Sequence, residues 1–142
     1  MSTANSRFAQ CLYFTSNALA RKTEKLAQES WSRVGISPSH GYLLLLTLEE
    51  PGMQAGTLAR QLQLQPSTIT RLLEKLESMK LVQRVTEGKT TSVFPTNRAK
   101  QLLPKMQESV TEFTTKYMEI LGKEESTRLV HGMAKIADKL ST

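Results

Sequence analysis

Cysteine is nearly absent from this chain of 142 residues, which has a single one, Cys11. One cysteine cannot close a disulfide within the chain, and alone it cannot supply a cysteine-based zinc site. Long apolar runs are also absent: the longest, Tyr42–Leu46, is far below the roughly 20 residues that span a bilayer. No basic start followed by an apolar core appears near Met1, so we expect no secretory signal and a cytoplasmic protein.

Signatures of catalysis are missing as well. The seven glycines are scattered singly, so no phosphate-cradling loop is seen. The two histidines, His40 and His131, fall in separate expected helices without the acidic neighbours of a proton relay or a metal site. We therefore expect no enzyme, no metal and no cofactor.

The composition of the chain is that of one globular domain, with 39% hydrophobic and 23% charged residues. Its formal net charge is +6, and most of that lies in residues 53–100, which hold eight basic and three acidic side chains. A localised positive field suits a polyanion, because each phosphate that is neutralised releases condensed counterions. A solvated face that happens to be basic is the alternative.

Both ends of the chain predict long helices. Apolar or small residues recur every three to four positions over 5–29, which indicates a first helix. Ser37 offers an N-cap oxygen and Pro38 a preset φ, so an apolar core helix is expected to begin there and end near Leu48.

The middle of the chain has the spacing of a helix-turn-helix followed by a β-hairpin. Residues 57–76 predict two short helices that touch through apolar side chains, with Gln63 in a turn where glycine is often favoured. Extended segments over 82–86 and 91–95 follow directly, as in the wing of a winged helix. We expect a mainly α fold with a small β-hairpin wing. Two packed helices without a nucleic-acid role remain the alternative.

The outward face of the second short helix is the expected DNA-reading surface. Arg71 is the candidate for base readout, because arginine can fork onto guanine in the major groove, whereas Arg84 and Lys89 are candidates for phosphate. The candidate DNA-binding residues on this helix and the wing are Ser67, Thr68, Thr70, Arg71, Lys75, Arg84 and Lys89.

The segment after the wing predicts two further helices, over 96–121 and 123–140. In the first, apolar residues alternate three and four positions apart, which is typical of a seam between helices. Such a surface is too apolar for a monomer, so we expect a two-fold dimer. The candidate dimerisation residues are Phe8, Leu12, Val110, Phe113, Tyr117, Ile120, Leu129, Met133, Ile136 and Leu140.

Three motifs in this order resemble one known family. Gly35-Ile36-Ser37-Pro38 opens the second helix, Gln54-Ala55-Gly56-Thr57-Leu58-Ala59 opens the third, and Pro66 to Glu77 forms the fourth. Lys80 to Arg84 enters the wing, and Pro95-Thr96 leaves it. Over about residues 5–140 the chain resembles the multiple-antibiotic-resistance regulator (MarR) family of bacterial transcription factors. The resemblance adds Gln54 to the candidate DNA-binding residues.

The resemblance implies a single MarR-like domain over 1–142. Its winged helix-turn-helix part would span about 37–96, and its helical dimerisation part about 5–30 and 97–141. The implied function is a homodimeric, sequence-specific regulator of transcription, a repressor in our interpretation, that binds a near-palindromic operator in double-stranded DNA. A phenolic or lipophilic small molecule would release it, with no membrane involved.

The chain also departs from the family pattern. The wing is short and lacks the usual Asp-Arg-Arg tip, and Gln65 replaces the usual cap before Pro66. Gly41 stands where the family often has a large aromatic residue, which would leave room beside it. We therefore take Cys11, His40 and Gly41 as candidates for an effector pocket or a redox site. An oxidant sensor acting through Cys11, and a winged-helix protein-interaction module that binds no DNA, are the alternative functions.

Overall fold

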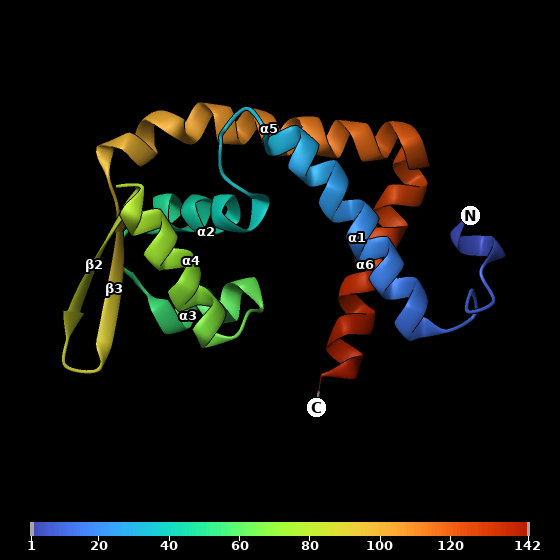
Figure 1. The fold of residues 1–142 in the computed structure, drawn as a ribbon, viewed down its shortest axis with the longest axis horizontal. Coiled ribbons are helices and arrows are strands. Elements are labelled where there is room, and N and C mark those ends of the chain that lie inside the picture. The colour runs from blue at the N-terminus through green and yellow to red at the C-terminus, as the bar shows by residue number, and fades with distance from the viewer. Residues whose placement is uncertain (1, 142) are drawn as a thin grey trace.

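The computed structural model describes residues 2–141, which form six α-helices and a small sheet that lies at one end of the molecule (Figure 1). A 3-10 turn, η1 (Thr3–Asn5), precedes the first helix, α1 (Leu12–Trp31). The expected start of this helix at residue 5 is therefore wrong. The hydroxyl group of Ser2 accepts a hydrogen bond from the backbone N–H of Asn5, and that of Ser6 accepts one from the backbone N–H of Phe8. Such local hydrogen bonds compete with helix formation.

The second helix, α2 (Pro38–Glu49), begins as the sequence predicted. The Ser37 hydroxyl accepts the backbone N–H of His40 at 3.4 Å, and Pro38 occupies the first turn. Leu43, Leu44 and Thr47 on this helix are buried, and Thr47 donates its hydroxyl hydrogen to the carbonyl of Leu43. This helix is therefore the centre of the core.

The helix-turn-helix consists of α3 (Ala55–Leu62) and α4 (Pro66–Ser78), as expected. Gln63 ends α3 in the left-handed region with φ 56°, which is the conformation that favours glycine. The side-chain amide of Gln63 donates to the carbonyl of Arg60 at 2.9 Å, and so helps to close the helix end.

The wing is an antiparallel hairpin of β2 (Val82–Glu87) and β3 (Thr90–Pro95), joined by a two-residue turn in which Gly88 has φ 62°. A third strand, β1 (Met53–Gln54), pairs with the other edge of β3, so the strand order is β1-β3-β2. The sequence did not predict β1, because two residues are too few to show alternation. Figure 1 shows the turn of the hairpin pointing away from α5.

The two last helices are α5 (Asn97–Leu121), capped by the Thr96 hydroxyl, and α6 (Lys123–Leu140). Both agree with the sequence prediction, and Gly122 separates them with φ 88°. In Figure 1, α5 runs along the whole molecule, whereas α1 and α6 cross on the side away from the wing. Among residues 2–141, no helix has the length and hydropathy needed to cross a membrane.

The hydrophobic core lies almost entirely within the winged part. Its buried side chains come from the end of α1, from α2 to β3, and from the first half of α5, and they are Trp31, Leu43, Leu44, Leu58, Ala59, Ile69, Leu73, Leu76, Leu81, Val82, Val93, Ala99 and Met106. In α6 the buried position within the described residues is Ser126.

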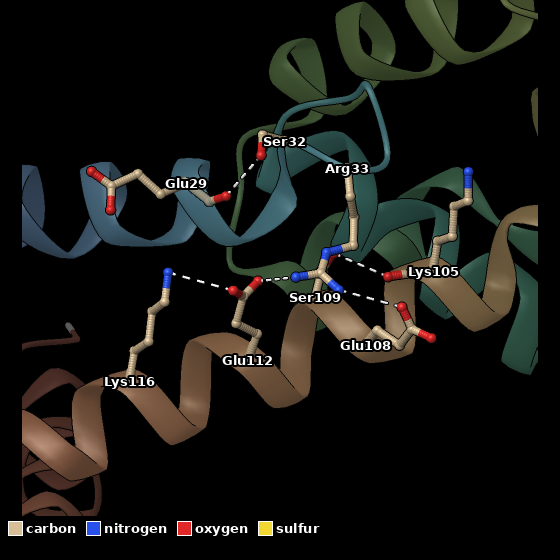
Figure 2. Close-up of polar contacts among 8 residues, drawn as sticks. All are labelled: Glu29, Ser32, Arg33, Lys105, Glu108, Ser109, Glu112 and Lys116. Atoms are coloured by element: carbon tan, nitrogen blue, oxygen red, sulfur yellow. Dashed lines mark hydrogen bonds and ion pairs between the residues drawn. The ribbon is translucent and has the colours of Figure 1, made fainter.

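Arg33, in the loop after α1, ties that loop to α5 (Figure 2). Its guanidinium donates to the carboxylate of Glu108 at 3.3 Å and to that of Glu112. Lys116 forms a further ion pair with Glu112 at 3.5 Å, so the acceptor is shared between two cations. These contacts fix the point at which the terminal helices join the winged part.

Candidate nucleic-acid interface

Helix α4 has one apolar and one polar face, as its spacing predicted. Ile69, Leu73 and Leu76 are buried against the core, which turns the other side chains outward. The exposed residues of the opposite face include Ser67, Thr70, Arg71, Glu74 and Lys75. The helix therefore presents hydroxyl and basic groups together, on a rigid element anchored by its own leucines.

Two contacts within α4 hold its polar side chains close to the helix. Arg71 Nη2 lies 3.5 Å from Thr68 Oγ1, and the Thr70 hydroxyl donates to the carbonyl of Pro66 at 3.0 Å. Because the hydroxyl hydrogen of Thr70 is already donated to Pro66, the Thr70 oxygen is left to act as an acceptor, for example from the amino group of a base. Arg71 needs only to exchange this one long bond to reach a base edge.

Arg84 is held by Glu77, which the sequence pattern did not single out. The Glu77 carboxylate accepts from Arg84 Nη2 at 2.8 Å, from its Nε at 3.3 Å and from its backbone N–H at 3.2 Å. Hydrogen bonding from the Arg84 side chain and backbone lowers the pKa of Glu77, and the same pairing raises the pKa of Arg84. Arg84 is thus half-buried and joins the end of α4 to β2.

Lys89 stands exposed in the turn of the wing, where the sequence placed it. Behind it the hydroxyl groups of Thr86 and Thr91 lie 3.1 Å apart across the hairpin. The side chain at the tip therefore carries a single positive charge on a short, threonine-rich ribbon. A lysine there suits a phosphate contact.

The start of α2 lies beside α4. The ring Nδ1 of His40 is 2.6 Å from the Ser37 hydroxyl, and burial followed by the positive charge of Lys75 lowers the pKa of His40. Gln54, the residue before α3, is exposed, and its side chain makes no capping bond within residues 2–141. His40 therefore extends the polar surface beside α4.

A cavity of about 600 Å³ lies between α1, the start of α2 and the turn after α3. Its walls include Glu24 of α1, Tyr42 of α2, Leu64 of the turn and Phe113 of α5. From the sequence, Cys11, His40 and Gly41 were expected in such a pocket, and none of the three lines it. Cys11 is instead the exposed residue before α1, and His40 faces α4.

The expected space beside Gly41 is not there. A Cβ atom at this position would lie 2.1 Å from Cζ3 of Trp31, whose indole fills the room that the missing side chain leaves. The large aromatic side chain is therefore supplied by the end of α1 rather than by α2. The indole ring also packs against Tyr42, with ring centroids 5.6 Å apart.

The candidate dimerisation residues divide into two groups. Val110, Phe113, Tyr117 and Leu129 are partly covered by the chain itself. The exposed group consists of Phe8, Leu12, Ile120, Met133, Ile136 and Leu140. A groove of about 590 Å³ between α1 and α6 is lined by members of the exposed group, so the apolar surface there is continuous.

Comparison with known proteins agrees with this geometry. Residues 34–90 match the model of the MarR family. The HTH-type transcriptional repressor MdtR of Bacillus subtilis (strain 168) is 23% identical over 128 residues, which cover 88% of this chain and 83% of that protein.

The fold recurs in solved structures of transcriptional regulators. The repressor CouR bound to p-coumaroyl-CoA superposes with a TM-score of 0.83 at 19% identity, covering 94% of this chain and 96% of that one. The S. aureus MepR–DNA complex superposes with a TM-score of 0.79 at 18% identity, covering 92% and 98%. The resemblance to the MarR family that the motifs indicated is confirmed over residues 34–90, and the proteins of that family are DNA-binding regulators rather than enzymes.

Proposed function

We propose that this protein is a sequence-specific regulator of transcription, a repressor, that binds a near-palindromic operator in double-stranded DNA as a homodimer. The observation that carries the proposal is the exposed hydroxyl and basic face of α4, followed in the chain by a wing whose turn carries the exposed Lys89. The similar repressor MdtR and the MepR–DNA complex support it. Such a regulator acts in the cytoplasm, where the DNA is.

The homodimer is supported by the exposed apolar residues of the terminal helices. Leu12 on α1 and Ile136 and Leu140 on α6 line one groove, which a second copy would cover. Two-fold symmetry would place two α4 helices on one duplex, with half-sites about one helical turn, ~34 Å, apart. We expect light scattering to give twice the chain mass of 15.9 kDa.

The DNA contacts divide into base readers and phosphate contacts. We expect Arg71, with Thr70 and Ser67 beside it, to read bases, whereas Lys89 and Lys75 neutralise phosphates. Arg84 serves the interface indirectly, because its pairing with Glu77 sets the position of the wing relative to α4. This revises the phosphate contact that the sequence predicted for Arg84.

The experiment begins with selection of the operator from genomic fragments by the pure protein. Arg71→Ala should then weaken operator binding by ~1–3 kcal/mol per half-site and change binding to random DNA little. Lys89→Ala should weaken both alike and lower the salt slope by about one for each phosphate that is no longer neutralised. Arg128→Ala is the matched control, because it removes the same charge from an exposed position on α6.

The outcomes separate the alternatives. Absence of binding to any duplex at low salt would favour a protein-interaction module. Uniform weakening by Arg71→Ala on operator and random DNA would make Arg71 a phosphate contact and leave the hydroxyl groups as readers. For oxidant sensing, peroxide must weaken DNA binding in the wild type and leave Cys11→Ser unaffected.

Control by a small molecule is the remaining part of the proposal. The structure of CouR with p-coumaroyl-CoA shows that a protein of this fold holds a ligand. The cavity beside Tyr42 touches both the terminal helices and the winged part, so an occupant there would contact the two parts at once. We expect a lipophilic effector that releases the protein from DNA.

A further inference from the structure

The cavity between α1 and the helix-turn-helix is lined by charge of one sign only. Of the described residues that line it, Glu24 is the only charged one, and most of the remaining wall is apolar. Residues 2–141 provide no ion pair to this carboxylate, which accepts a single hydrogen bond, from the Gln28 amide at 3.3 Å. The largely apolar cavity therefore carries one negative charge, on an exposed carboxylate at its rim that has no ion-pair partner within residues 2–141.

Two aromatic rings share this wall, those of Tyr42 and Phe113. Burial, and to a smaller extent the neighbouring Tyr117, raises the pKa of Tyr42, so its phenol stays neutral at physiological pH. A neutral aromatic ring attracts a cation over its face. Rings and carboxylate together therefore favour a positive charge and offer nothing to neutralise a negative one.

We propose that the effector of this protein is a lipophilic cation, an ammonium or other onium group on an aromatic body, whose charge lies at Glu24 and whose body fills the space beside Tyr42 and Phe113. This inference rests on the proposed control by a small molecule and names the chemical class of that molecule. It excludes carboxylates and phosphate-bearing thioesters as ligands of this cavity.

The position of the cavity explains how such a ligand reaches the DNA-binding surface. Leu62 and Leu64, at the end of α3 and in the turn after it, line the cavity only a few residues before α4 begins at Pro66. A body wedged between α1 and this turn changes the position of α4 relative to the terminal helices. The change favours release when the ligand binds the released form more tightly than the DNA-bound form.

Calorimetry without DNA tests the charge preference directly. The probes are (2-naphthylmethyl)trimethylammonium, the anion 2-naphthylacetate and the neutral 2-naphthylethanol, which share one aromatic body. We expect the cation to bind about tenfold more tightly than the neutral probe and the anion to bind more weakly than either. Equal or tighter binding of 2-naphthylacetate overturns the proposal.

A matched pair of variants locates the charge. Glu24→Gln should weaken binding of the cation about tenfold and leave the affinity for the neutral probe unchanged, because the substitution removes only the charge. Glu29→Gln, on the same helix but outside this cavity, should change neither. Unchanged cation affinity in Glu24→Gln overturns the assignment of Glu24. Were that variant to misfold, the comparison of the three probes on the wild type would still decide.

The DNA-binding proposal fails or stands separately. Without ligand, the wild type and Glu24→Gln should bind operator DNA equally. Addition of the cation should strongly weaken operator binding by the wild type and affect that of Glu24→Gln much less. If the protein binds the cation but no DNA, the proposed cation site stands and the proposed regulatory function is wrong. If the protein binds DNA but shows no preference for the cation, the proposed regulatory function stands and the proposed cation site is wrong.

Discussion

The winged part and the terminal helices are rich in the same apolar residues, yet they bury them to very different degrees. Leu43, Leu58 and Leu76 of the winged part are 0% exposed. On the terminal helices, Leu12 is 63% exposed and Leu140 is 65% exposed. The first set is satisfied within one chain, whereas the second remains open to a surface that one chain does not provide.

This difference assigns separate roles to the two parts. The winged part has its own core, closed by Trp31 and Met106 from the adjoining helices, and so holds α4 rigidly. In the proposed homodimer the terminal helices complete their packing against the second copy, so we expect their arrangement to change with whatever fills or covers that interface. The cavity at Tyr42 lies where the rigid and the adjustable parts meet.

The largest effect is expected from a charge on the open surface. Ile136→Glu would bury an uncompensated carboxylate in the proposed homodimer, and it should give a monomer of 15.9 kDa by light scattering. Loss of one half-site should lower operator affinity by about a thousandfold or more. Lys135→Glu introduces the same side chain one position away and should remain dimeric. A dimeric Ile136→Glu would contradict the assignment of this face.

A pair of identical substitutions compares the two parts directly. Gly41→Ala places a Cβ against the Trp31 indole and should lower the free energy of unfolding by about 1–3 kcal/mol. Gly132→Ala on α6 meets nothing within 4 Å and should raise it by about 0.4–1 kcal/mol, because alanine restricts the unfolded chain. Urea denaturation measures both. Equal effects would mean that Gly132 is as closely packed as Gly41.

The Glu77–Arg84 pair gives a smaller effect that depends on pH. Since its pKa is lowered in the folded protein, Glu77 adds stability above its ordinary pKa of 4.5, and this is lost as the pH falls through the folded value. Arg84→Gln should return the Glu77 pKa toward 4.5 and flatten the loss of stability in acid. NMR titration of the Glu77 carboxyl measures the first effect. An unchanged pKa would contradict the pairing.

Much of the fold was predictable, because local sequence signals mark the boundaries of most of its helices and strands. The Ser37-Pro38 cap, the Gly88 turn and Thr96 each mark an element boundary through side-chain or φ preferences. The start of α1 was mispredicted, because Ser2 and Ser6 satisfy backbone N–H groups outside any apolar pattern. This error concerns the end of one element, and the missed strand β1 adds only two residues to the edge of the sheet, so the architecture is unchanged.

The site was less predictable, because its side chains meet through tertiary contacts. Nothing local indicates that Trp31 fills the space beside Gly41, ten residues later. The same is true of Glu77, which binds Arg84 only because α4 and β2 fold back on each other. Glu24 faces the cavity from a helix whose periodicity indicates only an interface. The outward face of α4 was predicted correctly, because helix geometry alone determines it.

The smallest expected effect concerns the end of α4. Lys80 lies in the left-handed region with φ 62°, the N–H of Leu81 donates to the Leu76 carbonyl, and that of Lys80 to the Glu77 carbonyl. This is the arrangement in which glycine usually ends a helix, because any other residue brings its Cβ close to the following carbonyl oxygen. The end of α4 therefore carries a conformational cost.

Lys80→Gly should relieve that cost and raise the free energy of unfolding by about 0.5–1 kcal/mol, after allowing for the greater entropy of glycine in the unfolded chain. The Thr96 hydroxyl still donates to the backbone carbonyl at position 80, so the entry to α5 is unchanged. Lys135→Gly, within α6, makes the same replacement at a helical position and should lower it by about 1 kcal/mol. Urea denaturation of the two variants should therefore shift the midpoint in opposite directions. A loss of stability in both would mean that the backbone at Lys80 is unstrained.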